Sequence, residues 1–389
     1  MSAEKARLFC SKPFEWFEVT QLNDRGTVYL CCPTWLSVPV GNLRTQSVQE
    51  IWNSPAAQEL RQSILDGSFR FCDSGKCPYL QTSSGPVTTV HEVEDPDLKR
   101  AITDNLTRLP YGPKKVICTY DQSCNLSCPS CRTEIIVEVR HRDEILDIQE
   151  KIRSQALKDA DYLNITGSGD PFGSPFFRKW LRTMSKAEVP KLERLHLHSN
   201  GILWTPRMWS TLSEAIRPMI KSAEISIDAA TAETYSINRR GGRFEALLEN
   251  LMFIQTLRRE GPLQYVKISM VVQDNNFREM PEFVRLGQRL SFDAVYFSQL
   301  VNWGTFSDEE FRHRAVHRPE HPHYWEFVTL LQDPLFEAPI VDLGNLTSTR
   351  RAGTRRAGRG LRRRLHRLLD KVRTGSICGP RPLRGGGAS

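Results

Sequence analysis

The stretch Lys115-Val-Ile-Cys-Thr-Tyr-Asp-Gln-Ser-Cys124-Asn-Leu-Ser-Cys128-Pro-Ser-Cys131 decides the fold. Its first part, Lys115–Tyr120, is rich in β-branched and aromatic residues and predicts a strand. Three cysteines with CxxxCxxC spacing follow in a loop. Thiolates this close can converge on one metal centre. Structural zinc takes four protein ligands, whereas three cysteines on a four-iron cubane would leave one iron open.

Outward from this stretch, strands and helices alternate along the chain. The candidate strands are Lys115–Tyr120, Tyr162–Thr166, Arg194–His198, Ala223–Asp228, Tyr265–Val272 and Ala294–Gln299. Amphipathic stretches between them predict helices over Asp143–Leu157, Phe176–Met184, Pro206–Ile216, Phe244–Leu257 and Met280–Leu290. This βαβ spacing predicts a parallel sheet, and right-handed crossovers curl it into a partial (β/α)6 barrel like part of a TIM barrel. Function then belongs at the carboxyl ends of the strands.

A small cysteine-rich α+β unit precedes the predicted barrel. Two strands, Phe17–Gln21 and Thr27–Cys31, flank the turn residues 23–26, and a helix is expected over Ser47–Ile64. Ser47 and Glu50 form a capping-box pattern at its start. We divide the chain into this unit at 1–85, a connector at 86–112, the barrel with its extension at 113–347, and a tail at 348–389.

The cysteine loop after the first strand resembles the signature of the radical S-adenosylmethionine (SAM) superfamily. The resemblance implies that Cys124, Cys128 and Cys131 hold a [4Fe–4S] cluster whose open iron binds SAM, which is cleaved to a 5′-deoxyadenosyl radical. Later segments match further family elements in order along the strands. They imply SAM contacts from Gly167, Ser168, Gly169, Asp170, Ser199, Asn200, Ser226, Asp228 and Arg239. Ser130 stands where the family has an aromatic residue that packs on adenine, so that contact is not implied.

The amino-terminal cysteines are similar to the SPASM and twitch modules of that superfamily. Cys10 is followed by Gly26 and then, after four intervening residues, by Cys31; Cys72 and Cys77 lie downstream. The resemblance implies one auxiliary [4Fe–4S] cluster on Cys10, Cys31, Cys72 and Cys77. Cys32 is the alternative to Cys31, and a four-cysteine zinc knuckle is the alternative to the cluster. The module precedes the barrel, whereas in the family it usually follows it.

Several other residues have simpler interpretations. Cys118 is read as a buried strand residue, and Cys378 as a free thiol. His317, His321 and His323 could bind a metal, but Pro319 and Pro322 break helical pairing of the first two. Residues 302–304 are expected at the barrel mouth, as a pocket wall or as simple packing.

Charge divides the chain into two parts. Of 53 basic residues, 13 fall between Arg350 and Arg384 with a single acid, Asp370, and the rest of the chain is mildly acidic. We expect the tail to be disordered, with an anionic surface as its possible contact. No segment is long and apolar enough to span a bilayer, and the first residues lack the apolar core of a secretory signal. The expected location is the cytoplasm.

The resemblance implies hydrogen abstraction from a substrate, with a reductant such as flavodoxin or ferredoxin as partner. We favour dehydrogenation or epimerisation of a sugar- or cyclitol-like metabolite, because residues 1–110 leave no room for a separate peptide-binding domain. A peptide-maturing enzyme is the alternative. A non-catalytic zinc or iron–sulfur protein that binds nucleic acid or membrane through its basic tail is the alternative of another class.

Overall fold

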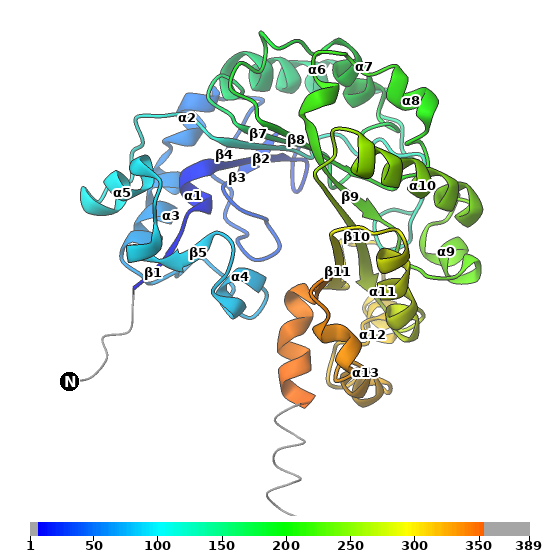
Figure 1. The fold of residues 1–389 in the computed structure, drawn as a ribbon. Coiled ribbons are helices and arrows are strands. Elements are labelled where there is room, and N and C mark those ends of the chain that lie inside the picture. The colour runs from blue at the N-terminus through cyan, green and yellow to red at the C-terminus, as the bar shows by residue number, and fades with distance from the viewer. Residues whose placement is uncertain (1–6, 354–389) are drawn as a thin grey trace, which may run out of the picture.

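The computed structural model describes residues 7–353 of the 389-residue chain. Its spine is a sheet with the strand order β12-β11-β10-β9-β8-β7-β6-β2-β3-β4, which curves through the molecule like an arch (Figure 1). The six predicted barrel strands are confirmed as β6 to β11, with bounds Lys115–Cys118, Tyr162–Ile165, Arg194–Ser199, Ile220–Ser226, Tyr265–Val272 and Ala294–Gln299. All their neighbouring pairs are parallel.

The sheet extends beyond the predicted six strands on both sides. β12 (Val341–Asp342) pairs parallel with β11. On the other side β2 (Trp16–Thr20) pairs parallel with β6, and β3 (Thr27–Tyr29) and β4 (Gly41–Asn42) follow in antiparallel register. The order begins and ends at different strands, so within the described residues the sheet is open.

The amino-terminal unit is therefore joined edge to edge to the main sheet. Register places Glu18 of β2 opposite Ile117 of β6. Along β2, Phe17 and Val19 are fully buried, whereas Trp16, Glu18 and Thr20 face the inner side of the arch, where they line a cavity. This period-two alternation is that of a strand with two differently solvated faces.

Helices cover the outer side of the arch (Figure 1). They are α6 (Arg142–Lys151, continued by a π-helical turn over Ile152–Ala156), α7 (Pro175–Thr183), α8 (Pro206–Ser210), α9 (Ala232–Asn238), α10 (Phe244–Glu260) and α11 (Met280–Arg289). After β11 come α12 (Asp308–Arg314) and α13 (Tyr324–Leu330). The predicted helix over Pro206–Ile216 is wrong in its second half. The Thr211 hydroxyl donates to the Met208 carbonyl at 2.7 Å, a side-chain bond that competes with helix continuation.

Short helices shape the amino-terminal unit: α1 (Lys12–Glu15), α2 (Val48–Trp52), α3 (Pro55–Leu65), α4 (Pro78–Thr82) and α5 (Pro96–Thr103). The capping box of Ser47 and Glu50 is confirmed. The single helix predicted over Ser47–Ile64 is wrong. Ser54 is extended and caps a second helix that starts at Pro55, because a residue before proline avoids the helical conformation.

Residues 86–112, expected to be a connector, carry structure of their own. β5 (Val87–Thr89) pairs antiparallel with β1 (Leu8–Cys10), and α5 follows it. Buried Arg61 donates to the carbonyls of Pro13 and Thr107, which ties this segment to the amino-terminal unit. Among residues 7–353, no helix combines the length and apolarity needed to span a bilayer. The tail predicted to be disordered lies, from residue 354 onward, outside the described residues, and so does Cys378.

Candidate functional site

A cavity of about 610 Å³ lies on the inner side of the arch. One part of its wall comes from the loops after β6 and β7 and includes Cys131, Gly167 and Ser168. Another part comes from the amino-terminal unit and includes Trp35 and Tyr79. The sheet pairing of β2 with β6 brings these two walls together, and sequence alone did not predict that contact.

The predicted cluster loop follows β6 directly. Cys124 and Cys128 are buried, whereas Cys131 is exposed and lines the cavity. Burial raises the pKa of Cys124 to about 11, with a further contribution from the Asp170 carboxylate. A bound iron cluster would reverse that effect, because a coordinated thiol is deprotonated.

Arg132, which sequence analysis did not single out, fixes this loop. Its guanidinium donates to the backbone carbonyls of Gln122 and Ser168 and lies 3.2 Å from Cys131 Sγ. A basic residue directly after the third cysteine was the only available signal. Arg132 therefore holds the cysteine loop against the loop after β7.

The loop after β7 contains the predicted SAM residues 167–170. At Gly169, a side-chain Cβ would lie 2.5 Å from the Asp121 carbonyl oxygen and 2.7 Å from that of Ser123, so only glycine allows this approach. Asp170 is fully buried. Its carboxylate accepts hydrogen bonds from the backbone of the β7 loop and, at 2.8 and 2.9 Å, from Ser199 Oγ and the Asn200 amide.

Asp170 thus joins the loops after β7 and β8. The Ser199 hydroxyl donates its hydrogen bond to the Asp170 carboxylate. Asn200 extends the link toward the cysteines, with its Nδ2 3.0 Å from Asn125 Oδ1 and 3.6 Å from Cys124 Sγ. Direct contact of these side chains with SAM stays a prediction, and the structure gives Asp170 an organising role.

Arg239 and Asp228 lie beside the second cysteine. Arg239 forms an ion pair of 2.9 Å with Asp228, and its Nη1 lies 3.7 Å from Cys128 Sγ. Asp228 has a φ of 59° and accepts a hydrogen bond from the Val271 amide. The Nε of Arg239 is buried without a hydrogen-bond partner among the described residues. Such an unsatisfied cationic donor next to the cysteines suits the carboxylate of a bound amino-acid group.

Ser226 ends β9 on the cavity side of the sheet. Its hydroxyl lies 2.8 Å from His198 Nε2 and 3.3 Å from Ser269 Oγ. His198 lines the cavity, together with Glu224 and Lys267, which form an ion pair of 2.6 Å. Although burial alone would raise the pKa of Glu224, Lys267 and His198 hold it well below its ordinary range.

The four cysteines predicted for the auxiliary cluster converge on a second, small cavity. Cys10, Cys31, Cys72 and Cys77 all line it, with Lys12 among the other wall residues. Cys32 points elsewhere, into the central cavity, where its Sγ lies 3.4 Å from Thr34 Oγ1. The geometry supports Cys31 over Cys32 as the fourth ligand. The ligand roles themselves stay predictions.

Two charged side chains that lack an ion-pair partner among the described residues face the central cavity. Lys12 and Glu18 line it, and among the described residues neither side chain has a hydrogen bond or an ion pair. Burial raises the pKa of Glu18 to about 7, although Lys12 opposes this rise. Neither residue is predictable from the sequence, because nothing in its local pattern separates it from an ordinary surface charge.

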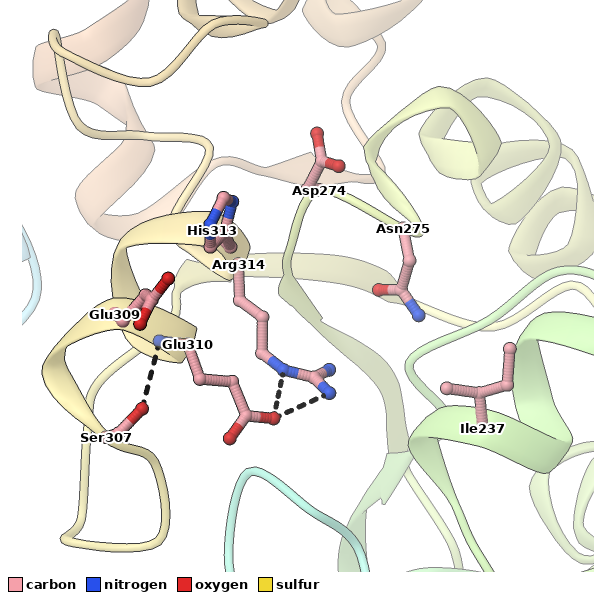
Figure 2. A pocket seen from close by; sticks show the side chains of 8 residues that line it. All are labelled: Ile237, Asp274, Asn275, Ser307, Glu309, Glu310, His313 and Arg314. Carbon is pink, nitrogen blue, oxygen red and sulfur yellow. Dashed lines mark hydrogen bonds and ion pairs between the residues drawn. The ribbon is translucent and has the colours of Figure 1, made fainter.

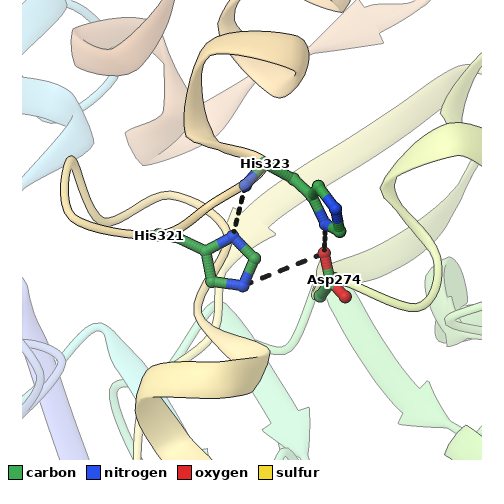
Figure 3. Close-up of side chains that lie close together, drawn as sticks. All are labelled: Asp274, His321 and His323. Carbon is green, nitrogen blue, oxygen red and sulfur yellow. Dashed lines mark hydrogen bonds and ion pairs between the residues drawn. The ribbon is translucent and has the colours of Figure 1, made fainter.

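The histidine-rich segment forms a separate polar cluster. His323 Nδ1 lies 2.6 Å from Asp274 Oδ1, and His321 Nε2 lies 3.8 Å from the same oxygen (Figure 3). His321 is already saturated, since its Nδ1 accepts from the His323 amide and its Nε2 donates to the His313 carbonyl. A metal would have to displace one of these bonds. His317 lies outside the cluster.

A surface cleft of about 550 Å³ adjoins this cluster. Asp274, His313 and Arg314 line it, with Ile237 on the opposite side (Figure 2). Arg314 is paired with Glu310 at 3.0 Å. Trp303, from the segment expected at the barrel mouth, lines the central cavity instead of this cleft.

The residues present fit the cofactors that the sequence resemblance implies. Three thiols gather on one loop beside an unsatisfied buried arginine nitrogen, and four more line one small cavity. Cysteine thiolates are the protein ligands of iron–sulfur clusters. The first set would hold the cluster that binds SAM, and the second set the auxiliary cluster.

Comparisons with known proteins agree with this geometry. Residues 122–287 match the profile of the radical SAM superfamily, and residues 10–78 match an iron–sulfur cluster-binding domain named SPASM. A protein named GTP 3′,8-cyclase from Peptoclostridium acidaminophilum is 28% identical over 196 residues, which are 47% of this chain and 54% of that protein. The chain thus spans about half the length of this curated relative.

Solved structures show partial likeness. A structure of anSMEcpe with bound AdoMet and Cp18Cys peptide is 20% identical, with a TM-score of 0.42 and coverage of 57% of this chain and 59% of that one. TYW1 with a lysine-pyruvate adduct is 17% identical, with a TM-score of 0.36 and coverage of 57% and 72%. Streptococcus suis SuiB bound to precursor peptide SuiA is 11% identical, with a TM-score of 0.36 and coverage of 63% and 53%.

The radical SAM profile covers the cysteine loop and the strands β7 to β10, and the SPASM profile covers all four cysteines that are predicted to bind the auxiliary cluster. The first domain implies SAM and a [4Fe–4S] cluster, and the second an auxiliary iron–sulfur centre. Residues 122–287 therefore form a domain of the radical SAM superfamily, and it is preceded by a SPASM iron–sulfur cluster-binding domain at residues 10–78.

Proposed function

We propose that this enzyme abstracts a hydrogen atom from a small polyhydroxylated metabolite held in the central cavity, leading to its dehydrogenation or epimerisation. The observation that carries the proposal is the shared cavity. Its wall includes Cys131 and Ser168 on the SAM side and Lys12, Trp35 and Tyr79 of the SPASM module on the other. A substrate there contacts both halves of the protein. We propose domain boundaries at residues 85, 112 and 347, as the sequence predicts. The strand β2 belongs to the amino-terminal unit and also pairs with β6 of the main sheet.

The lining of the cavity suits hydroxyl groups. Trp16 and Tyr296 contribute aromatic rings to the wall, with the ammonium groups of Lys12 and Lys267 over them at 4.0 and 4.6 Å from the ring centres. Glu18 offers a carboxylate without an internal hydrogen bond or ion pair in the part of the chain that the structure describes. Asn164 Oδ1 is buried and has no hydrogen-bond donor among the described residues. An unsatisfied buried acceptor is costly unless a ligand supplies a donor. A sugar hydroxyl would supply the donor that Asn164 Oδ1 lacks and could also donate to the Glu18 carboxylate.

SAM would be held on the side of the central cavity that contains Cys131 and Ser168. When bound, the cluster at Cys124, Cys128 and Cys131 supplies the electron that cleaves SAM to the 5′-deoxyadenosyl radical. Arg239 would orient the SAM carboxylate through its free Nε. Gly169 lets the β7 loop approach closely. Glu18 would accept the proton that leaves a substrate hydroxyl. A one-electron donor such as flavodoxin or ferredoxin is the partner that this chemistry requires.

A small substrate is also consistent with the relative named GTP 3′,8-cyclase, whose name states a nucleotide substrate. The decisive experiment uses anaerobically reconstituted full-length enzyme, SAM, dithionite and perdeuterated monosaccharides or cyclitols. We expect deuterium in 5′-deoxyadenosine with at least one of them. If deuterium transfer occurs from labelled peptides and from none of the metabolites, the substrate class is wrong and peptide maturation replaces it.

A further inference from the structure

Lys12 lies between the two cavities of the molecule. It is the second residue after Cys10, lies in α1, and lines both the four-cysteine cavity and the central cavity. Its side chain is 96% shielded from solvent, since only 4% is exposed. The SPASM module thus presents one buried cation at the wall that separates its cysteines from the substrate.

The surroundings of the Lys12 ammonium lack a countercharge in contact with it. Its Nζ lies 4.0 Å from the ring centre of Trp16 and 4.9 Å from that of Tyr79. Among the described residues, no carboxylate lies within ion-pair distance of it. Cation–π contacts offset part of the desolvation cost. A buried ammonium nevertheless normally has a charged partner, because the loss of water is costly.

The four-cysteine cavity offers that partner. A [4Fe–4S] cluster with four thiolates carries net negative charge, and one more negative charge after one-electron reduction. The indole Nε1 of Trp35 also donates a hydrogen bond of 3.3 Å to Cys31 Sγ, one of the four sulfur atoms that line this cavity. Reduction potentials of such clusters depend on nearby charge, hydrogen bonds to sulfur and solvent exposure.

We propose that Lys12 is a positioning residue for electron transfer, whose charge stabilises the reduced auxiliary cluster on the side that faces the substrate. The inference rests on the proposed assignment of Cys10, Cys31, Cys72 and Cys77 as its ligands. The step concerned is the uptake of one electron by the oxidised cluster. In a dehydrogenation, the substrate radical would give up this electron, and its hydroxyl proton would pass to Glu18.

The test measures the midpoint potential of the auxiliary cluster alone. It uses the full-length chain with Cys124, Cys128 and Cys131 all changed to Ala, so that one cluster remains. Lys12→Met and Lys12→Gln remove the charge, and Lys12→Arg keeps it. Lys76→Met is the matched control. Lys76 lies next to Cys77 but is exposed and paired with Asp73 at 2.9 Å. Redox titration followed by electron paramagnetic resonance gives each potential.

We expect a more negative potential in Lys12→Met and Lys12→Gln, and a potential near that of the parent in Lys12→Arg and Lys76→Met. Equal potentials in all four variants would overturn the proposal. If the neutral variants lose iron and sulfide while Lys12→Arg retains them, the charge is needed to hold the anionic cluster, which supports it. If Lys12→Arg loses them too, Lys12 is a packing residue and the proposal fails. No substrate or SAM is present, so these outcomes are independent of the proposed reaction.

Discussion

Gln21 of the SPASM module donates a hydrogen bond of 2.8 Å from its Nε2 to Ser168 Oγ in the loop after β7. The two residues are 147 positions apart in the chain. Gln21 directly follows β2, the strand that joins the module to β6. The module therefore supports the loop predicted to meet SAM, and it is more than an appended cluster carrier.

Gln21→Ala should weaken SAM binding through this contact. A typical net hydrogen bond contributes about 1 kcal/mol, which corresponds to about a fivefold rise in Kd. Equilibrium dialysis with labelled SAM on reconstituted protein measures it. Gln58→Ala, which removes a 3.0 Å bond to the Asn53 carbonyl inside the module, is the control and should leave Kd unchanged. Equal Kd values in both variants would show that the Ser168 contact is irrelevant to SAM.

Cys124→Ala should abolish 5′-deoxyadenosine formation, because a cluster needs its thiolate ligands. Iron content should fall by about four atoms per chain, the content of one [4Fe–4S] cluster. Cys118→Ala is the matched control, since Cys118 is a fully buried cysteine of β6. It should keep the iron and the activity of any protein that remains folded. Retention of both clusters in Cys124→Ala would remove this cysteine from the ligand set.

Cys31→Ala and Cys32→Ala test which of two adjacent thiols binds the auxiliary cluster, because the two thiols line different cavities. Cys31 faces the four-cysteine cavity and Cys32 faces the central cavity. We expect Cys31→Ala to lose the auxiliary cluster and Cys32→Ala to retain it, as judged by Mössbauer spectroscopy and iron content. The reverse pattern would exchange their roles.

Glu18→Gln should uncouple SAM cleavage from product formation. Loss of a general base typically lowers the rate about 10²- to 10⁴-fold, whereas 5′-deoxyadenosine should still form. Since burial raises the pKa of Glu18 to about 7, the wild-type rate should rise with pH as this carboxyl ionises. Glu15→Gln is the control, because Glu15 pairs with Lys115 at 3.2 Å and lines neither the central cavity nor the four-cysteine cavity. A pH profile that is unchanged in Glu18→Gln would exclude proton transfer by this residue.

His196 should make the fold sensitive to acid. Its Nδ1 lies 2.9 Å from Ser222 Oγ, and burial lowers its pKa to about 3. A lowered histidine pKa means that the unfolded state binds the proton first, so stability is lost as pH falls below about 6.5. Between pH 7 and pH 5 the loss is about 2 kcal/mol. Urea unfolding at both pH values should show this loss to be smaller in His196→Gln, and an equal loss in both proteins would contradict the assignment.

Local sequence patterns were sufficient to predict most of the parallel strands of the sheet. β10 and β11 have the predicted bounds, since each combines a β-branched or aromatic run with clear flanking breaks. The predictions failed where a competing local interaction acted, at Ser54-Pro55 and at Thr211. In both places a short-range steric or hydrogen-bonding effect outweighed helical periodicity.

The sequence by itself determined the cysteine sets, the alternation of strands and helices, and the order of the SAM-like segments, because these depend on spacing along the chain. Only the tertiary structure decided that β2 extends the sheet, that Asp170 is used within the protein, and that Lys12 and Glu18 face one cavity. Pairing between distant strands and burial of single charges arise from contacts among residues far apart in sequence. No local periodicity encodes such contacts.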